Sequence, residues 1–227
     1  VRTDRFGMYP TPSMTDHPFI RDRQAIFGSR PAAMLFALLL AAGALSCGPA
    51  AETRGPQRVL LISLDGFRWD YVDRPAAVRI RELAARGVRA ERMIPVFPSK
   101  TYPNHYSIVT GLTPDLHGIV ANTMRDSLLG SFRNSDTVAQ AESRWWGGEP
   151  IWVTAEKQGR RAASFFWPGS ETAIDGVRPS WWRVYQHTLP NAVRVTQVLD
   201  WLALPADSAP ALIALYLSDT DDIGHAA

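Results

Sequence analysis

The chain has 227 residues, of which 46% are hydrophobic and 20% charged, a composition typical of one globular domain of soluble type. Its formal net charge is +2, but the excess lies in residues 1–47, which carry five arginines against three acidic residues and leave the remainder neutral. A neutral remainder argues against a nucleic-acid duplex as partner and against a polybasic membrane-binding face. The single cysteine rules out an internal disulfide framework.

The front of the chain has the pattern of an export signal. Arginines precede an apolar run, AAMLFALLLAAGALS from Ala32, which is too short to span a bilayer comfortably. Cys47 follows the run directly, as in the lipobox of bacterial lipoproteins, although Ala44 stands where leucine is usual. We predict a leader over 1–47, a polar linker over 48–57, export to the periplasm or cell envelope, and a lipid anchor at Cys47 as the membrane contact. The alternative is an ordinary secretory signal with an incidental cysteine.

From residue 58 onward, apolar runs alternate with segments of helical spacing. In chain order we predict a strand over 59–64, a helix over 75–87, a helix beginning near residue 101, a long polar stretch over 125–149, a helix over 150–159, a strand over 161–167, a helix over 191–204 and a strand over 211–217. This alternation predicts an α/β domain with a mainly parallel sheet flanked by helices.

Acidic residues stand where two of the predicted strands end. Asp65 follows the strand over 59–64, and the strand over 211–217 is followed by a group of possible metal ligands, Asp219, Asp221, Asp222 and His225. Carboxylates combined with an imidazole suit zinc or another borderline cation better than calcium. Asp221 and His225, four residues apart, could meet one ion across a single helical turn. Each signal is weak alone, because Asp-Gly turns and Asp-x-x-x-His matches are common.

The segment FPSKTYPNHYSIVTG, residues 97–111, places Thr101 at the start of a short helix between Pro98 and Pro103. A divalent cation and the helix N-terminus would both favour the ionised hydroxyl, which makes Thr101 a candidate nucleophile. The alternative is a helix-capping threonine, which is common. Capping explains neither the flanking prolines nor the acidic residues at the strand ends.

Five segments follow one another from residue 58 to the end of the chain: DGFRWDY, FPSKTYPNHYSIVTGLTPDLHGIVANTM, WWGGEPIWVTAEKQG, FFWPGSE and LYLSDTDDIGH. Together they resemble the nucleotide pyrophosphatase/phosphodiesterase family of the alkaline phosphatase superfamily. The resemblance implies an alkaline-phosphatase-like fold over residues 58–227. It also implies hydrolysis of phosphodiester or pyrophosphate bonds in nucleotides or other small-molecule diesters, with two zinc ions as cofactors.

By that resemblance, Thr101 is the nucleophile that forms a covalent nucleotidyl intermediate. Thr101 and Asp65 would share one zinc ion, while Asp221 and His225 would bind the other. Family members continue with further ligands that complete both sites. We therefore expect a C-terminally truncated, partial catalytic domain that is inactive by itself, with its last strand, over 211–217, inside the sheet.

The resemblance also implies how the substrate is held. Asn122 would donate a hydrogen bond to a non-bridging phosphate oxygen. Tyr102 would stack on the nucleobase, with Tyr185 as a weaker candidate for the opposite side, whereas His105 and His117 are expected to be structural. A neutral Asn122 suits a diester. A phosphate monoesterase of the same superfamily is the alternative enzyme, and an inactive binding remnant is the alternative of another class.

Overall fold

The computed structural model describes residues 57–227. The predicted leader, Cys47 and nearly all of the predicted linker lie outside the described residues, so export and lipid anchoring stay predictions. Among residues 57–227, no helix is both long and apolar enough to cross a membrane.

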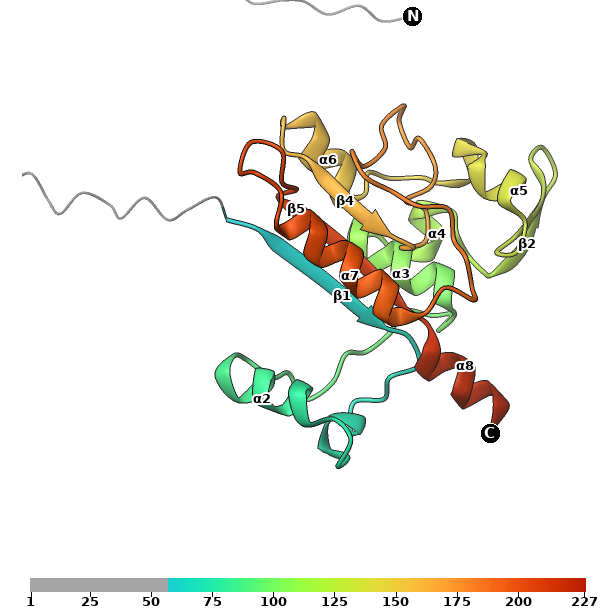
Figure 1. The fold of residues 1–227 in the computed structure, drawn as a ribbon. Coiled ribbons are helices and arrows are strands. Elements are labelled where there is room, and N and C mark those ends of the chain that lie inside the picture. Colours follow the sequence, from blue (N-terminus) through green and yellow to red (C-terminus); the bar gives the residue numbers. More distant parts are fainter. Residues whose placement is uncertain (1–56) are drawn as a thin grey trace, which may run out of the picture. The chain divides into compact units, whose positions relative to one another are not determined.

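The described part of the chain alternates between strands and helices (Figure 1). In chain order the elements are β1 (Val59–Leu64), the 3-10 helix η1 (Tyr71–Asp73), α2 (Val78–Arg86), α3 (Thr101–Thr110), α4 (Pro114–His117), β2 (Thr123–Asp126), β3 (Gly130–Arg133), α5 (Thr137–Ala141), the 3-10 helix η2 (Ser143–Trp145), α6 (Ile151–Lys157), β4 (Ala162–Phe165), α7 (Asn191–Leu202), β5 (Leu212–Leu217) and α8 (Asp219–Ala226).

Three strands form the central sheet in the order β1-β5-β4, and both pairings are parallel. Leu212 of β5 is in register with Val59 of β1 on one side and with Ala162 of β4 on the other. The predicted parallel α/β fold is confirmed, and β5 lies inside the sheet as expected. The strands β2 and β3 form a separate antiparallel hairpin.

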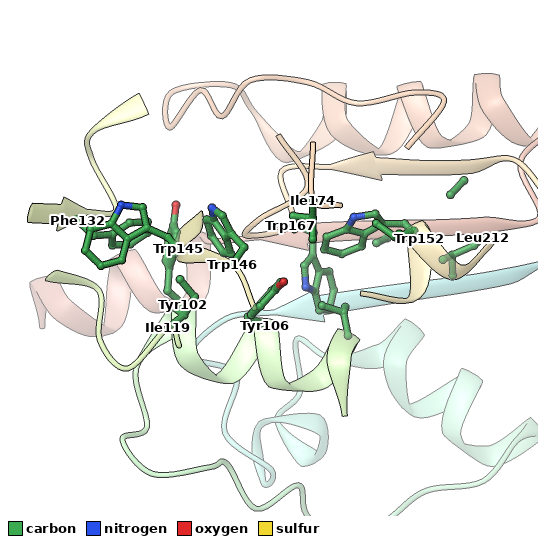
Figure 2. Packing of buried hydrophobic residues seen from close by; sticks show 14 residues of the cluster. Tyr102, Tyr106, Ile119, Phe132, Trp145, Trp146, Trp152, Trp167, Ile174 and Leu212 are labelled. Atoms are coloured by element: carbon green, nitrogen blue, oxygen red, sulfur yellow. The ribbon is translucent and has the colours of Figure 1, made fainter. Parts of the chain in front are cut away.

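Helices cover both faces of β5, because alternate residues of a strand point to opposite faces. On one face, Leu212 and Ala214 pack in a cluster with side chains of α3 and α6, including Tyr106 and Trp152 (Figure 2). On the other face, Ile213 and Leu215 of β5 pack in a second cluster with Phe165 of β4 and with Val198 and Trp201 of α7. Burial on both faces explains why β5 is a continuous apolar run.

The stretch over 125–149, for which the sequence suggested no elements, folds into most of the β2–β3 hairpin, α5 and η2. Two aspartates shape it: the Asp126 carboxylate accepts the backbone N–H groups of Leu128 and Leu129, and Asp136 caps α5. Phe132, Trp145 and Trp146 anchor the stretch in the core, where their side chains are buried (Figure 2). Aromatic anchors, rather than periodic apolar residues, therefore fold this polar segment.

The helix predicted over 75–87 is present as α2, but its apolar side chains are not buried. Val78 is 45% exposed and Leu83 64% exposed. The edge strand β1 is also open, with Leu60 42% exposed and Ile62 49% exposed. Their register with Ile213 and Leu215 puts these two side chains on the face of the sheet that α7 covers over β4 and β5. The open edge of β1 and its exposed apolar side chains together form a surface prone to self-association.

We predict that the 227-residue chain self-associates through β1. Replacing Ile62 by lysine should lower the average mass measured by analytical ultracentrifugation, because a charged side chain on an edge strand opposes edge-to-edge pairing. The control is Leu128→Lys, which changes a leucine that is 89% exposed on the hairpin turn. A monomeric parent chain, or an equal effect of both substitutions, would contradict association through β1.

Candidate active site

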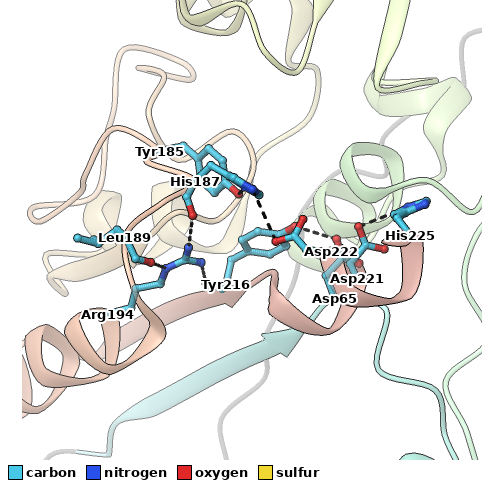
Figure 3. A network of polar contacts seen from close by, with 9 residues as sticks. All are labelled: Asp65, Tyr185, His187, Leu189, Arg194, Tyr216, Asp221, Asp222 and His225. Atoms are coloured by element: carbon cyan, nitrogen blue, oxygen red, sulfur yellow. Dashed lines mark hydrogen bonds and ion pairs between the residues drawn. The ribbon is translucent and has the colours of Figure 1, made fainter. Parts of the chain in front are cut away.

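The parallel pairing of β1 with β5 brings the residues after both strands to one edge of the sheet. The backbone N–H of Asp65 donates to the carbonyl of Leu217 at 2.9 Å, so the loop after β1 begins against the end of β5. Gly66 then passes so close to α8 that a β-carbon placed there would lie 2.6 Å from the α-carbon of Asp221. Asp65 and Asp221 consequently lie side by side (Figure 3).

Asp65 is held by donors on both carboxylate oxygens. Its Oδ2 accepts hydrogen bonds from the hydroxyls of Thr101, at 3.1 Å, and Tyr216, at 2.8 Å. Its Oδ1 accepts the backbone N–H of Gly66 at 3.1 Å. The carboxylate is thereby fixed with one oxygen facing the Thr101 hydroxyl.

Thr101 is the first residue of α3, and it does not cap the helix. The capping position belongs to Lys100, which makes no side-chain capping bond, and the Thr101 hydroxyl points to Asp65 instead. The Thr101 hydroxyl thus lies at a helix N-terminus, where the macrodipole favours negative charge. The capping interpretation of Thr101 does not fit this geometry.

Asp221 and His225 face each other across one turn of α8, as their spacing suggested. The Asp221 Oδ2 atom lies 3.6 Å from Nε2 of His225, with the Asp221 side chain 31% exposed and the His225 side chain 82% exposed. Burial raises the pKa of Asp221, and the negative charge of Asp65 raises it further. Two carboxylates that repel each other beside a histidine form a favourable place for a cation.

The donor atoms at this edge are chemically suited to a divalent cation. Carboxylate oxygens, an imidazole nitrogen and a hydroxyl match zinc, and a cation would relieve the repulsion between Asp65 and Asp221. Within residues 57–227, no group of three or more His, Cys, Asp or Glu side chains could hold one ion. The two ligand pairs expected from the sequence, Asp65 with Thr101 and Asp221 with His225, therefore stay a prediction.

Asn122 bonds to the backbone of the residue that follows Thr101. Its Oδ1 accepts the backbone N–H of Tyr102 at 2.9 Å, which fixes the amide and leaves Nδ2 available as a donor. Asn122, Thr101, Asp65, Asp221 and His225 all line one cavity of about 1040 Å³. Five of the seven predicted site residues thus meet in one place.

The two tyrosines proposed to hold the nucleobase lie away from the lining of this cavity. Tyr102 is 8% exposed; its hydroxyl donates to Gln140 at 2.7 Å and its ring packs against Phe132 and Trp146. Tyr185 is half-buried, with its ring centroid 6.3 Å from that of Tyr216. Stacking of a nucleobase on either ring stays a prediction.

Two residues near the site had no functional signal in the sequence. Tyr216 lies on β5 opposite Ser63, and strand alternation alone would have shown only that it faces the same side as Ala214. Arg194 is fully buried and donates to the carbonyls of His187, Leu189 and Tyr216 (Figure 3). A buried arginine cannot be recognised from its helical position, because its partners come from distant segments.

This parallel α/β fold gathers a threonine hydroxyl, two carboxylates and a histidine at the carboxyl edge of its sheet. The profile of the family "Type I phosphodiesterase / nucleotide pyrophosphatase" matches residues 59–227. The chain belongs to this family.

Individual relatives agree with this assignment. The chain is 43% identical over 168 residues to human ectonucleotide pyrophosphatase/phosphodiesterase family member 1, covering 73% of this chain and 18% of the relative. It is 42% identical over 186 residues to venom phosphodiesterase 2 of Crotalus adamanteus, covering 81% of this chain and 22% of that relative. Among solved structures, an inactive threonine-to-alanine variant of murine ectonucleotide pyrophosphatase/phosphodiesterase 5, in complex with AMP, matches with a TM-score of 0.70 and 34% identity, covering 74% of this chain and 45% of that one. The chain thus spans about a fifth of these curated relatives and under half of the solved structure.

We predict that Gly66→Ala destabilises the fold more than an ordinary glycine replacement. Gly66 has a φ of 68° and its missing β-carbon would collide with the backbone of Asp221, so the substitution adds steric conflict to backbone strain. The matched control is Gly159→Ala, where φ is 70° and no heavy atom lies within 4 Å of the added carbon.

The control should lose about 1 kcal/mol of unfolding free energy in urea, since only the left-handed backbone is strained. Gly66→Ala should lose clearly more. Equal losses would show that the close approach of Gly66 to α8 is not required.

We predict that, in a buffer with EDTA, Asp221→Asn raises the unfolding free energy at pH 7. Because the pKa of Asp221 is raised above its ordinary value of 3.8, the folded state favours the protonated carboxyl. The stability that protonation provides is complete below that ordinary value and is lost as pH rises through the raised pKa. The advantage of the asparagine variant should therefore shrink as pH falls toward 4.

The control for this titration is Asp207→Asn, which changes an exposed aspartate in another loop. Urea unfolding across the pH range measures both variants. If Asp221→Asn were less stable than its parent at pH 7, electrostatic conflict at this edge would not be the dominant effect.

Proposed function

We propose that this chain carries the nucleophile half of a metal-dependent nucleotide phosphodiesterase, which hydrolyses phosphodiester or pyrophosphate bonds through Thr101. The observation that carries the proposal is the Thr101 hydroxyl, which lies at the N-terminus of α3, bonds to Asp65 at 3.1 Å and lines the cavity. No capping role competes for this hydroxyl.

The relatives support the nucleotide as substrate class and the threonine as nucleophile. The murine relative was solved with AMP, and its inactive form carries a threonine-to-alanine substitution. Because this chain covers only part of its relatives, the activity is proposed for the complete gene product.

The chain's own residues would orient the attack. The Thr101 hydroxyl donates a hydrogen bond to Oδ2 of Asp65. This bond would turn a lone pair of Oγ1 toward the cavity. Attack forms an Oγ1–P bond and breaks the bond to the leaving oxygen, and water later breaks the Oγ1–P bond. The N-terminus of α3 favours the negative charge on the threonine oxygen and on the phosphate.

Two divalent cations, zinc by family resemblance, would be held by Asp65 with Thr101 and by Asp221 with His225. When bound, they would lower the pKa of the threonine hydroxyl and neutralise the phosphate charge. Catalytic zinc usually has three protein ligands, so we infer that the described residues alone bind zinc weakly and support little turnover.

Asn122 favours a diester over a monoester. Its side chain is neutral and lines the same cavity as Thr101, whereas a monoester with its additional negative charge would be better matched by a cationic side chain. The cavity, at about 1040 Å³, also has room for a second substituent on the phosphate.

We predict that Thr101→Ala in the complete gene product removes nearly all hydrolysis of p-nitrophenyl thymidine monophosphate, while zinc content stays near that of the parent. Thr101→Ser should keep part of the activity, because it retains an attacking hydroxyl. Release of p-nitrophenol measures turnover, and elemental analysis measures zinc.

Thr110→Ala serves as the control, because that hydroxyl, at the other end of α3, bonds only within the helix and to the residue-112 amide. Near-parental turnover by Thr101→Ala would overturn the assignment of the nucleophile. Faster hydrolysis of p-nitrophenyl phosphate than of the diester would favour the monoesterase alternative.

A further inference from the structure

The peptide unit that follows the nucleophile is anchored at both of its polar ends. Its N–H, from Tyr102, donates to Asn122 at 2.9 Å, and its carbonyl, from Thr101, accepts from Nδ1 of His105 at 2.7 Å. A peptide unit bonded on both sides cannot rotate without losing one of these bonds. The backbone from which the Thr101 side chain projects is thereby held in place.

The partners of His105 determine which ring nitrogen carries the proton. A carbonyl oxygen only accepts, so Nδ1 must be protonated. In the neutral ring Nε2 then accepts from the Ser63 hydroxyl, 2.7 Å away on β1. The imidazole therefore connects the central sheet to the backbone of the nucleophile.

The surroundings hold the His105 ring in one orientation. The side chain is 4% exposed, and the ring makes edge-to-face contacts with Trp167 and Tyr216 at centroid distances of 5.3 and 5.0 Å. The indole N–H of Trp167 donates to the His105 carbonyl at 3.0 Å. Tyr216 also donates to Asp65, so the same aromatic frame supports the carboxylate and the histidine.

We propose that His105 is a positioning residue for the Thr101 nucleophile, acting through its Nδ1–H bond to the Thr101 carbonyl. This inference rests on the proposed function of Thr101. It assigns His105 a part in the reaction although it touches no substrate.

His117 is a second buried histidine with which the tautomer of His105 can be compared. Its ring is also fully buried, but its Nδ1 accepts the backbone N–H of Ile119 at 3.1 Å, so Nε2 carries the proton and donates to Ser107 at 2.9 Å. The two buried histidines thus hold opposite tautomers, and only His105 bonds to the nucleophile's peptide unit.

Substitution by asparagine or glutamine can test separately the hydrogen bonds made by Nδ1 and by Nε2 of each histidine. Asparagine places an N–H donor where Nδ1 lies, and glutamine places one near Nε2. His105→Asn should therefore keep the bond to the Thr101 carbonyl, whereas His105→Gln should lose it. For His117 the conservative change is glutamine.

In the complete gene product, His105→Asn should keep most of the parental kcat for p-nitrophenyl thymidine monophosphate. His105→Gln should lower kcat on the order of tenfold or more with little change in KM, because a small misplacement of a nucleophile slows attack more than binding. Both His117 variants should keep parental kcat, even where His117→Asn lowers the melting temperature. A kcat for His105→Gln equal to or above that of His105→Asn would overturn the proposal.

A measurement that does not depend on catalytic activity tests this inference independently of the proposed function. In the ¹⁵N-histidine NMR spectrum of the 227-residue chain, His105 should show a protonated Nδ1 and a bare Nε2, with the opposite pattern for His117. The variants assign the signals. A protonated Nε2 on His105 would refute the positioning role whatever the enzyme does. The expected tautomers together with an active Thr101→Ala variant would refute the proposed nucleophile, and with it the positioning role, while the hydrogen bonds of His105 would stand as described.

Discussion

The site depends on the parallel pairing of β1 with β5. Because the two strands run in the same direction, the residues that follow them emerge at one edge, where Asp65 meets Asp221. An antiparallel pairing would separate the same residues by the length of a six-residue strand, roughly 20 Å. The ladder also places Tyr216 opposite Ser63, so the supports of Asp65 and His105 come from adjacent strands.

This placement carries an electrostatic cost that the fold itself does not remove. Asp65 has three hydrogen-bond donors, but its negative charge still raises the pKa of the neighbouring Asp221. The aromatic and amide groups beneath the site do not neutralise charge; they restrict motion. His105 and Asn122 bond to the peptide unit that follows Thr101, and Tyr216 bonds to the Asp65 carboxylate. Rigid positions and an unrelieved repulsion agree with the cation-dependent site proposed for this edge.

The sequence was informative where local pattern and chemistry coincide. The apolar runs over 59–64 and 211–217 predicted the strands, and the spacing of Asp221 and His225 predicted their contact across one turn. It was uninformative where a contact joins distant segments. Nothing in the sequence links Ser63 with His105, which are 42 residues apart, and the buried surroundings of Tyr102 depend on aromatic residues in a stretch that looked merely polar.

Apolar periodicity predicted one helix correctly without predicting its surroundings. The helical spacing over 75–87 predicted α2, yet none of the residues of this helix is buried. Periodicity reports that a helix has an apolar side and does not identify the surface that covers it.

The two walls of the cavity therefore differ in how firmly their side chains are held. One wall, from β1, α3 and the loop at Asn122, is fixed by the core and by the paired hydrogen bonds around Thr101. The other wall, from α2 and residues 87–95, contributes side chains such as Leu83 and Met93 that are largely exposed. In the proposed reaction, attack on phosphorus would demand placement to a fraction of an ångström, which suits the first wall. Discrimination among the groups attached to that phosphorus would tolerate looser contacts, so differences in substrate preference would arise on the second wall without disturbing Thr101.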